Sequence, residues 1–200
     1  MSEQQQVIRL NIWISNTTPR AVLLFRYRKK TLNRLVLWNL TDNTFIKGQW
    51  LTNAKIFPDR SMISPDGEYF AYFYGKYSKG YSGESYTIIS KPPFFTANIA
   101  VYSETGTWTG GAIYRNYKGQ KQLLISSKDH LFKGTHEKFL YDGTTILPTY
   151  IDCKETPRFI INGVSYEYKH GVIYNSSSSS LILDVSEDIF EDIKPDYELL

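Results

Sequence analysis

The sequence predicts an all-β protein, and three observations support this prediction. Short runs of β-branched and aromatic residues recur along the whole of the 200-residue chain. Gly, Pro, Asn and Asp bound these runs, as they bound strands that are joined by turns. Helical periodicity is confined to the C-terminal residues.

The expected strands follow one another along the chain. They are residues 7–14, 21–28, 34–40, 69–74, 97–103, 110–116, 120–126, 158–161, 164–168, 171–174 and 181–185. Residues 69–74 place aromatic side chains on both faces of a strand, because successive side chains point to opposite faces. We therefore expect this strand to be central in its sheet and packed on both sides.

One short helix is expected over residues 185–193. Asp184 and Glu187 have the spacing of a capping box, and Pro195 follows as a stop signal. The apolar residues that would dock this helix are four apart: Val185, Ile189 and Ile193. The acidic residues that would face outward are Glu187, Asp188, Glu191 and Asp192.

Turn signals recur at a nearly constant interval. They lie at residues 28–33, 66–67, 105–106, 142–143 and 175–180, and from residue 28 the successive separations are 38, 39, 37 and 33 residues. A four-stranded propeller blade has about forty residues. We therefore predict a propeller-like domain with about five blade-like units of roughly 38 residues and a short C-terminal helix. A β-sandwich or an irregular β-barrel is the alternative.

Length and composition favour a single domain over residues 1–200, with β units over 1–184 and an acidic helix and tail over 185–200. The single cysteine, Cys153, cannot form an internal disulfide, which favours an intracellular, cytoplasmic protein. The start MSEQQQ lacks the pattern of a signal peptide, and the apolar runs are too short to span a bilayer. No membrane contact is expected.

Charge is distributed unevenly, although the formal net charge is only +3. Residues 1–60 hold ten Lys and Arg against three acidic residues, and residues 184–200 hold seven acidic residues against one Lys. Clustered cations can bind nucleic acid by displacing counterions from phosphates. The candidate basic face consists of Arg26, Arg28, Lys29, Lys30 and Arg34. The alternative is that these residues protect a strand edge or face water.

The segment GKYSKGYSGES, residues 75–85, is the best candidate for a binding surface. It is rich in Tyr, Ser, Gly and Lys and has no hydrophobic pattern, which is typical of adaptable binding loops. It follows a strand that we expect to be rigidly packed. The candidate binding residues are Lys76, Tyr77, Lys79, Tyr81 and Tyr86. The favoured function is a non-enzymatic protein-interaction module, with a second copy of the chain as one partner.

Signals for catalysis are weak. His130, His136 and His170 lack metal-ligand spacing, and no cofactor is expected. The chain has no nucleophile elbow, P-loop or dinucleotide fingerprint. The enzymatic alternative is a hydrolase that acts on a polar or carbohydrate substrate through paired carboxylates. The candidates for such a pair are Asp59, Asp66, Glu68 and Glu84.

Two glycine-containing motifs have structural interpretations. In the turn Ser64-Pro65-Asp66-Gly67, proline presets φ, the aspartate can bond to its own backbone, and Gly67 takes a positive φ. Gly110-Gly111 indicates a bulge or a close approach of the backbone to an aromatic ring.

Four motifs follow one another in the first two thirds of the chain. They are GQW (48–50), SPDGEYFAYF (64–73), YTIISKPPFFTA (86–97) and WTGGAIY (108–114). Their order and spacing over residues 36–115 resemble an uncharacterised family of bacterial and large-DNA-virus proteins, although Lys91 stands where that family is expected to have Arg. The resemblance implies no activity, and a viral origin would make the virion the alternative location. The SPDG turn is similar to turns of WD40-like and TolB-like propeller blades.

Overall fold

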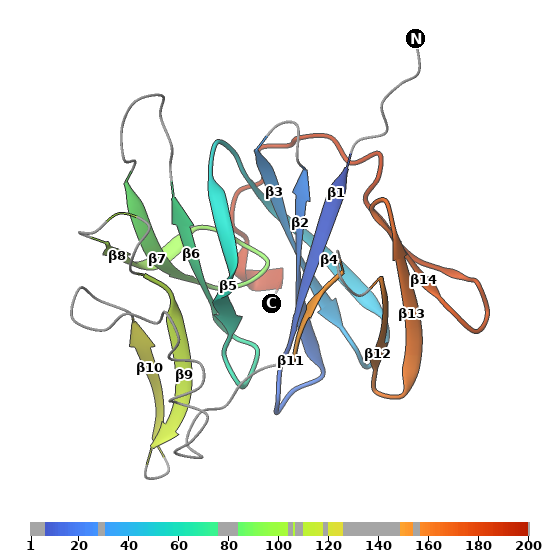
Figure 1. Cartoon of the computed structure of the whole chain (residues 1–200), viewed down its shortest axis with the longest axis horizontal. Coiled ribbons are helices and arrows are strands. Elements are labelled where there is room, and N and C mark those ends of the chain that lie inside the picture. Colours follow the sequence, from blue (N-terminus) through green and yellow to red (C-terminus); the bar gives the residue numbers. More distant parts are fainter. Residues whose placement is uncertain are drawn as a thin grey trace.

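The computed structural model describes residues 7–27, 31–75, 84–103, 106, 110–117, 120–125, 149–153 and 157–199. Strands dominate this part of the chain, and they form four antiparallel sheets (Figure 1). The predicted all-β class is therefore confirmed. Among the described residues no α-helix occurs, and a single 3-10 turn, η2 (Tyr197–Leu199), lies near the C-terminus.

One sheet occupies the middle of the molecule, and we call it the central sheet. Its strand order is β11-β1-β2-β3-β4. The strands are β1 (Ile8–Ile14), β2 (Arg20–Tyr27), β3 (Leu32–Asn39), β4 (Thr44–Leu51) and β11 (Thr149–Asp152). The first four strands are consecutive in the chain, whereas β11 pairs with β1 across a long separation in sequence.

The other three sheets are meanders of consecutive strands. The β5–β8 sheet contains β5 (Lys55–Ile63), β6 (Phe70–Gly75), β7 (Ser85–Ser90) and β8 (Ala97–Tyr102). The β9–β10 hairpin contains β9 (Ala112–Tyr117) and β10 (Gln120–Ile125). The β12–β15 sheet contains β12 (Arg158–Ile161), β13 (Val164–Lys169), β14 (Val172–Asn175) and β15 (Leu181–Asp184).

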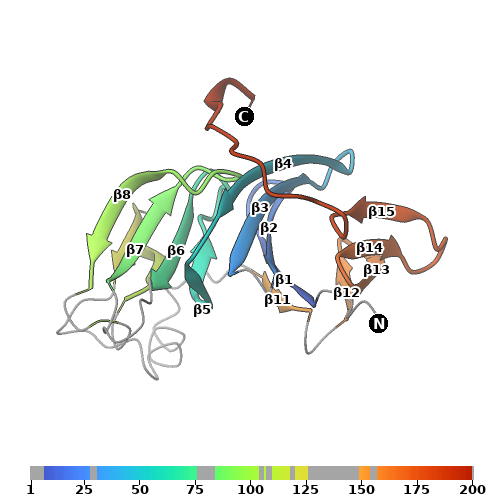
Figure 2. The same ribbon diagram turned by 90° about the horizontal axis from the view of Figure 1, so that it is seen from above.

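The central sheet is apolar on both faces. In β2, Leu23 belongs to one hydrophobic core and its neighbour Leu24 to another, and both are fully buried. This follows from the alternation of side chains along a strand. Phe159 and Ile161 of the β12–β15 sheet join the first core, and strands of the β5–β8 sheet join the second. The central sheet is therefore the middle layer of a stack, as Figure 2 shows.

The strand over residues 69–74 is central and packed, as its sequence predicts. β6 lies between β5 and β7, and its residues Phe70 to Phe73 are buried. Phe70 contacts Trp13 of the central sheet with ring centroids 4.9 Å apart, and Phe73 contacts Phe57 on the other face at 5.2 Å. β6 thus links two layers of the stack.

The regular interval between turns, from which five units were predicted, does not match the boundaries of these sheets. Of residues 28–33, the described residues 31–33 lie at the start of β3, and residues 66–67 join the first two strands of another sheet. Residues 175–180 precede the last strand of a third sheet, and residues 142–143 lie outside the described part. Hairpin turns occur at any position in a meander, so their interval does not define a blade.

The helix predicted over residues 185–193 is absent, and these residues have no helical structure. They begin the C-terminal strap, residues 185–199, which runs from β15 over β4 (Figure 2). Val185 is buried and Ile193 packs against the first core, as expected, but Ile189 is 73% exposed. Asp188, which was predicted to face outward, turns inward to Arg34.

An ion-pair cluster fastens this strap to the central sheet. Arg34 and Asp188 form an ion pair, and their side chains are only 5% and 16% exposed. The Arg34 guanidinium also lies 4.8 Å from the centre of the Trp50 ring. Lys47 Nζ lies 2.8 Å from the second carboxylate oxygen of Asp188. Further along, Gln49 Nε2 donates a hydrogen bond of 3.0 Å to the carbonyl oxygen of Ile193.

Asp188→Asn should lower the free energy of unfolding by about 2 kcal/mol, because it leaves a buried arginine without its counter-charge. Lys47→Gln removes the more exposed cation of the same cluster and should cost less than about 0.5 kcal/mol. Denaturant titration of both variants measures this difference. Equal, small losses in the two variants would show that the Arg34–Asp188 pair does not hold the strap.

Gly110 lies against the ring of Phe73, in agreement with the close approach that the sequence predicts. A Cβ atom at Gly110 would lie 2.1 Å from Phe73 Cε2, and Gly110 has a φ of +112°. Gly163 also has a positive φ, +79°, but a Cβ atom there would meet nothing within 4 Å. Substitutions at the two glycines can therefore distinguish the energetic cost of backbone strain from the cost of steric overlap.

Gly163→Ala should cost about 1 kcal/mol of folding free energy, since only the left-handed backbone opposes the methyl group. Gly110→Ala should cost about 3 kcal/mol, because the methyl group must also displace a buried aromatic ring. Thermal or urea unfolding of the two variants provides the comparison. If Gly110→Ala is no worse than Gly163→Ala, the contact with Phe73 is not tight.

Candidate functional site

The predicted binding loop leaves the β5–β8 sheet between β6 and β7. Lys76, Tyr77, Lys79 and Tyr81 lie outside the described residues, and Tyr86 lies on β7. Tyr86 pairs directly with Tyr74 of β6, at the end of the two strands where the loop begins. The structure thus describes the base of the loop and the one candidate residue that belongs to it.

Tyr86 is part of a row of aromatic rings that we call the tyrosine ladder: Tyr72, Tyr74, Tyr86 and Tyr102. Ring centroids are 6.1 Å apart between Tyr72 and Tyr74, 5.7 Å between Tyr74 and Tyr86, and 5.4 Å between Tyr86 and Tyr102. The last two contacts join direct cross-strand neighbours. Such aromatic pairs stabilise the strands that carry them.

The tyrosine ladder runs from the core to the surface. Tyr72 is 2% exposed and donates a hydrogen bond of 2.7 Å to the carbonyl oxygen of Phe95, whereas Tyr102 is 55% exposed. Burial is the main cause that raises the pKa of Tyr72, and it also raises the pKa of Tyr74. Tyr86 has a raised pKa too, through desolvation and its neighbour Glu84. These phenols therefore remain protonated hydrogen-bond donors at neutral pH.

The ladder ends on β8, which is the edge strand of its sheet. Among the described strands only β7 pairs with β8. Five of its six residues, ANIAVY, are exposed, and Ile99 is 53% exposed. Natural edge strands are commonly protected by Lys, Pro or inward-pointing charges, and β8 contains no charged residue and no proline. Among the described strands, β8 is therefore an edge strand with exposed and mostly apolar side chains.

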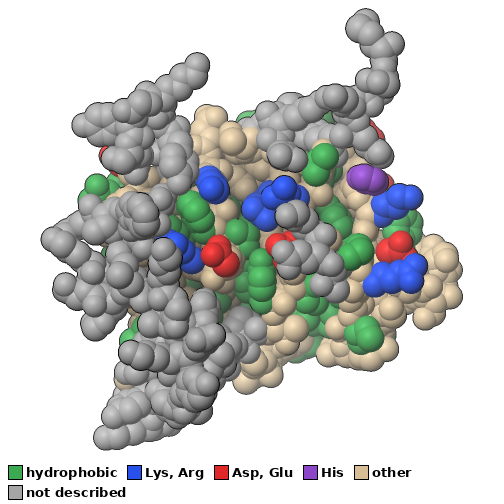
Figure 3. Space-filling view, in the orientation of Figure 1, with side chains coloured by type: hydrophobic (Ala, Val, Ile, Leu, Met, Phe, Trp, Pro, Cys, Tyr) green, Lys and Arg blue, Asp and Glu red, His purple; other side chains and the backbone are tan. Residues whose placement is uncertain are grey.

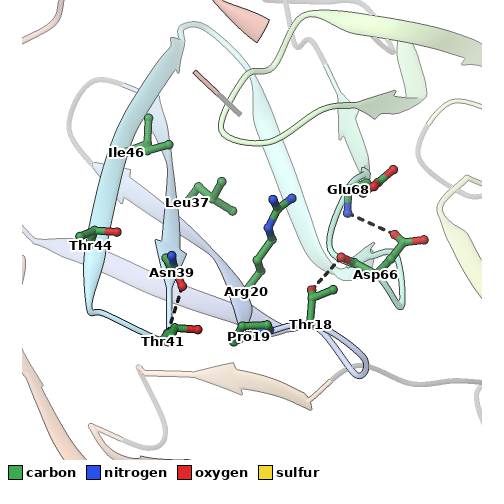
Figure 4. Close-up of a pocket in the computed structure, with 10 residues that line it drawn as sticks. All are labelled: Thr18, Pro19, Arg20, Leu37, Asn39, Thr41, Thr44, Ile46, Asp66 and Glu68. Carbon is green, nitrogen blue, oxygen red and sulfur yellow. Dashed lines mark hydrogen bonds between the residues drawn. The ribbon is translucent and has the colours of Figure 1, made fainter. Parts of the chain in front are cut away.

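A groove of about 500 Å³ lies between the central sheet and the β5–β6 turn. Figure 4 shows the Arg20 side chain extending into it, with Asp66 and Glu68 on the facing wall. Its remaining lining residues are Thr18, Pro19, Leu37, Asn39, Thr41, Thr44 and Ile46. Hydroxyl, amide and charged groups predominate, so the groove suits a polar ligand.

The Ser-Pro-Asp-Gly turn forms one wall of this groove, and its predicted geometry is confirmed. The Gly67 backbone donates to the carbonyl oxygen of Ser64 at 2.9 Å, and Gly67 has a φ of 77°. The Asp66 carboxylate accepts hydrogen bonds from the Ser64 hydroxyl at 2.5 Å and from the Glu68 backbone at 3.2 Å. The Thr18 hydroxyl in turn donates to the carbonyl oxygen of Asp66 at 2.7 Å.

The four carboxylates predicted for a hydrolase are not all together. Asp66 and Glu68 line the groove, whereas Asp59 lies on β5 and Glu84 precedes β7, beside Tyr86. Asp66 supports its own turn, and Glu68 is exposed. The sequence did not indicate Arg20, Thr18 or Asn39 as groove residues, since they come from the ends of β2 and β3 and the loop before β2.

The described residues of the candidate basic face, Arg26 and Arg34, do not lie on one surface. Arg28, Lys29 and Lys30 lie outside the described residues. Arg34 is 4% exposed, and its charge pairs with Asp188. Arg26 lies on the opposite face of the central sheet, next to Arg9 and Lys55.

The GQW and KPPF motifs meet across two sheets, although they are far apart in sequence. The Gln49 side-chain oxygen accepts hydrogen bonds from the Phe95 backbone at 2.7 Å and from the Thr96 backbone at 3.0 Å. The Gln49 backbone donates to the carbonyl oxygen of Pro93 at 3.1 Å, and the Pro92-Pro93 peptide is cis. These contacts give the motif residues a structural role, because they connect β4 of the central sheet with the segment between β7 and β8.

Neither a metal-ligand group among the described residues nor a known relative assigns a function to the chain. Within the described residues, no group of three or more His, Cys, Asp or Glu side chains could hold a metal ion. The same part of the chain has no helix of the length and apolar character needed to cross a membrane. No family model, curated protein or solved structure matches the chain. Functional inference therefore depends on the surfaces themselves.

Cys153 is expected to be chemically inert in the folded protein. It is 5% exposed, and burial, with a smaller effect of Asp152, raises the pKa of its thiol to about 12. A thiol with this pKa is almost entirely protonated at pH 8, and the protonated form is a poor nucleophile. A disulfide reagent at pH 8 should therefore label native protein at least about 100-fold more slowly than unfolded protein. Equal labelling rates would contradict a buried, protonated thiol.

Proposed function

We propose that this chain is a non-enzymatic protein-interaction module that binds another polypeptide at the outer edge of its β5–β8 sheet. One observation carries the proposal: an exposed edge strand without charge or proline, β8, bears the exposed end of the tyrosine ladder. An extended segment of a partner can add to such an edge through backbone hydrogen bonds. The neighbouring side chains then determine which segments are accepted.

The tyrosine ladder supplies the contact area for this binding. Tyrosine offers a large, rigid surface with a polar end, and its ordering costs little conformational entropy. Tyr74 and Tyr86 are already held by each other and by Tyr72, whose ring is buried. A partner would therefore meet a surface that is organised before binding, which favours affinity.

A second copy of this chain is the simplest partner. Edge strands of two identical molecules can pair antiparallel across a two-fold axis, and two-fold dimers are the commonest oligomers. A nucleic acid is less well suited to the ladder. Tyr86 donates a hydrogen bond of 3.4 Å to the Glu84 carboxylate, which places a negative charge where phosphates would have to approach.

The propeller-like arrangement remains part of this proposal. Strands β1–β4, β5–β8 and β12–β15 each form a four-stranded antiparallel meander, and the meanders stack face to face. Propeller blades have this construction. Blades present their outer strands at the rim, so the proposal agrees with an interaction surface on the edge strand β8.

Ile99→Lys should weaken association at least about tenfold, because a lysine on an edge strand opposes pairing with another strand. Ile160→Lys is the matched control, since Ile160 is 68% exposed on β12, the edge strand of another sheet. Sedimentation velocity over a range of concentrations measures self-association. Affinity purification from the native source compares other partners of the wild type and the two variants.

The fold of both variants should be unaffected, because both side chains face water. Loss of association in Ile99→Lys alone is the expected result. If the wild type and both variants have the same self-association and the same partners, the edge of β8 is not the interaction surface.

A further inference from the structure

A second cavity, of about 360 Å³, lies between the central sheet and the start of β5. Three of its described lining residues are cationic, Arg9, Arg26 and Lys55, and none of the described lining residues is acidic. Figure 3 shows Lys and Arg side chains gathered near the upper ends of the central strands and β5. The cavity uses none of the residues of the tyrosine ladder or of β8.

The strand register brings the two arginines together. Arg9 of β1 is directly opposite Arg26 of β2, and Arg26 is directly opposite Asn33 of β3. The three side chains therefore form a row on one face of the sheet. Like charges in directly opposite positions destabilise an antiparallel pair. A negatively charged group next to Arg9 and Arg26 would remove this repulsion.

The described side chains provide only partial neutralisation. Neither Arg9 nor Arg26 forms an ion pair or hydrogen bond through its side chain with another described residue, and Arg26 Nε is buried without a partner there. Burial lowers the pKa of Arg26, and Arg9 lowers it further, while Asp152 and Asp59 act in the opposite direction. A buried guanidinium N–H without an acceptor is costly. Among the described residues none supplies an acceptor to Arg26 Nε.

The base of the cavity is held in place by Asn33. The Asn33 side chain donates hydrogen bonds to the carbonyl oxygens of Ala54 at 2.9 Å and Leu51 at 3.3 Å. These bonds tie β3 to the connection between β4 and β5. Since Lys55 follows Ala54 directly, its backbone has a fixed position relative to Arg26. The three cations therefore belong to a rigid frame.

We propose that this cavity binds the phosphate group of a small phosphate-bearing molecule. Arginine presents paired N–H donors that match two phosphate oxygens, and lysine adds a third cation. Phosphate also offers more acceptor oxygens to these three donors than a carboxylate does. The volume is within the range of small-molecule sites. Asp59 and Asp152, which act on Arg26, would repel the adjoining phosphates of a polynucleotide.

The test measures binding of inorganic phosphate and pyrophosphate to the full chain by calorimetry at constant ionic strength. We expect saturable binding at one site in the wild type. Arg26→Gln should weaken it at least tenfold, and Lys55→Gln should weaken it several-fold. Arg20→Gln, which removes a cation from the separate groove, is the control and should leave binding unchanged. Phosphate should raise the melting temperature of the wild type and Arg20→Gln, but not that of Arg26→Gln.

Several results would overturn the proposal. They are no saturable binding, equal binding by the wild type and Arg26→Gln, or acetate binding as tight as phosphate binding. An oligonucleotide that binds without competition from phosphate would instead indicate a polynucleotide surface, and would also overturn it. If Arg26→Gln does not fold, Lys55→Gln decides the matter, because Lys55 is exposed. Failure here leaves the proposal for β8 unaffected, since the two tests share no residue.

Discussion

The central sheet has two apolar faces, and this constraint organises the rest of the molecule. Trp38 faces one core and Trp13 the other, and both are buried. A sheet of this kind is stable only when both faces are covered. The β12–β15 sheet covers one face, and the β5–β8 sheet with the β9–β10 hairpin covers the other. The grooves, the strap and the free edge lie at the margins of this stack.

Much of the fold could be predicted from local patterns, because most strands are bounded by turns and have uninterrupted apolar runs. β4, β5 and β7 were not predicted. Gly48 and the Pro58-Asp59-Arg60 segment interrupt the patterns of β4 and β5, and β7 lies between the predicted binding loop and the Pro92-Pro93 step. In β5 that segment lies at a shift of register, where the strand tolerates proline. β11 has only four residues, and its pairing with β1 is long-range. No local signal indicates such a pairing.

The sites depend on contacts that sequence spacing does not reveal. Residues 185–193 have helical spacing, but so short a helix is marginal by itself, and Asp188 pairs with an arginine 154 residues away. The sequence indicated Tyr86 but not Tyr102, because the tyrosine ladder exists only in the register of β7 with β8. The Arg9–Arg26 row likewise results from the register of β1 with β2.

The order of the layers in the chain bears on biosynthesis. The central sheet is built mainly from the first quarter of the sequence, whereas the strands that cover its Trp38 face are among the last to be made. Nascent chains fold as they emerge, and exposed apolar surface on a partly folded chain promotes aggregation. Until residues 158–184 leave the ribosome, the face that carries Leu10, Leu23 and Trp38 lacks its native cover. Chaperone binding to that face would protect the chain during this interval.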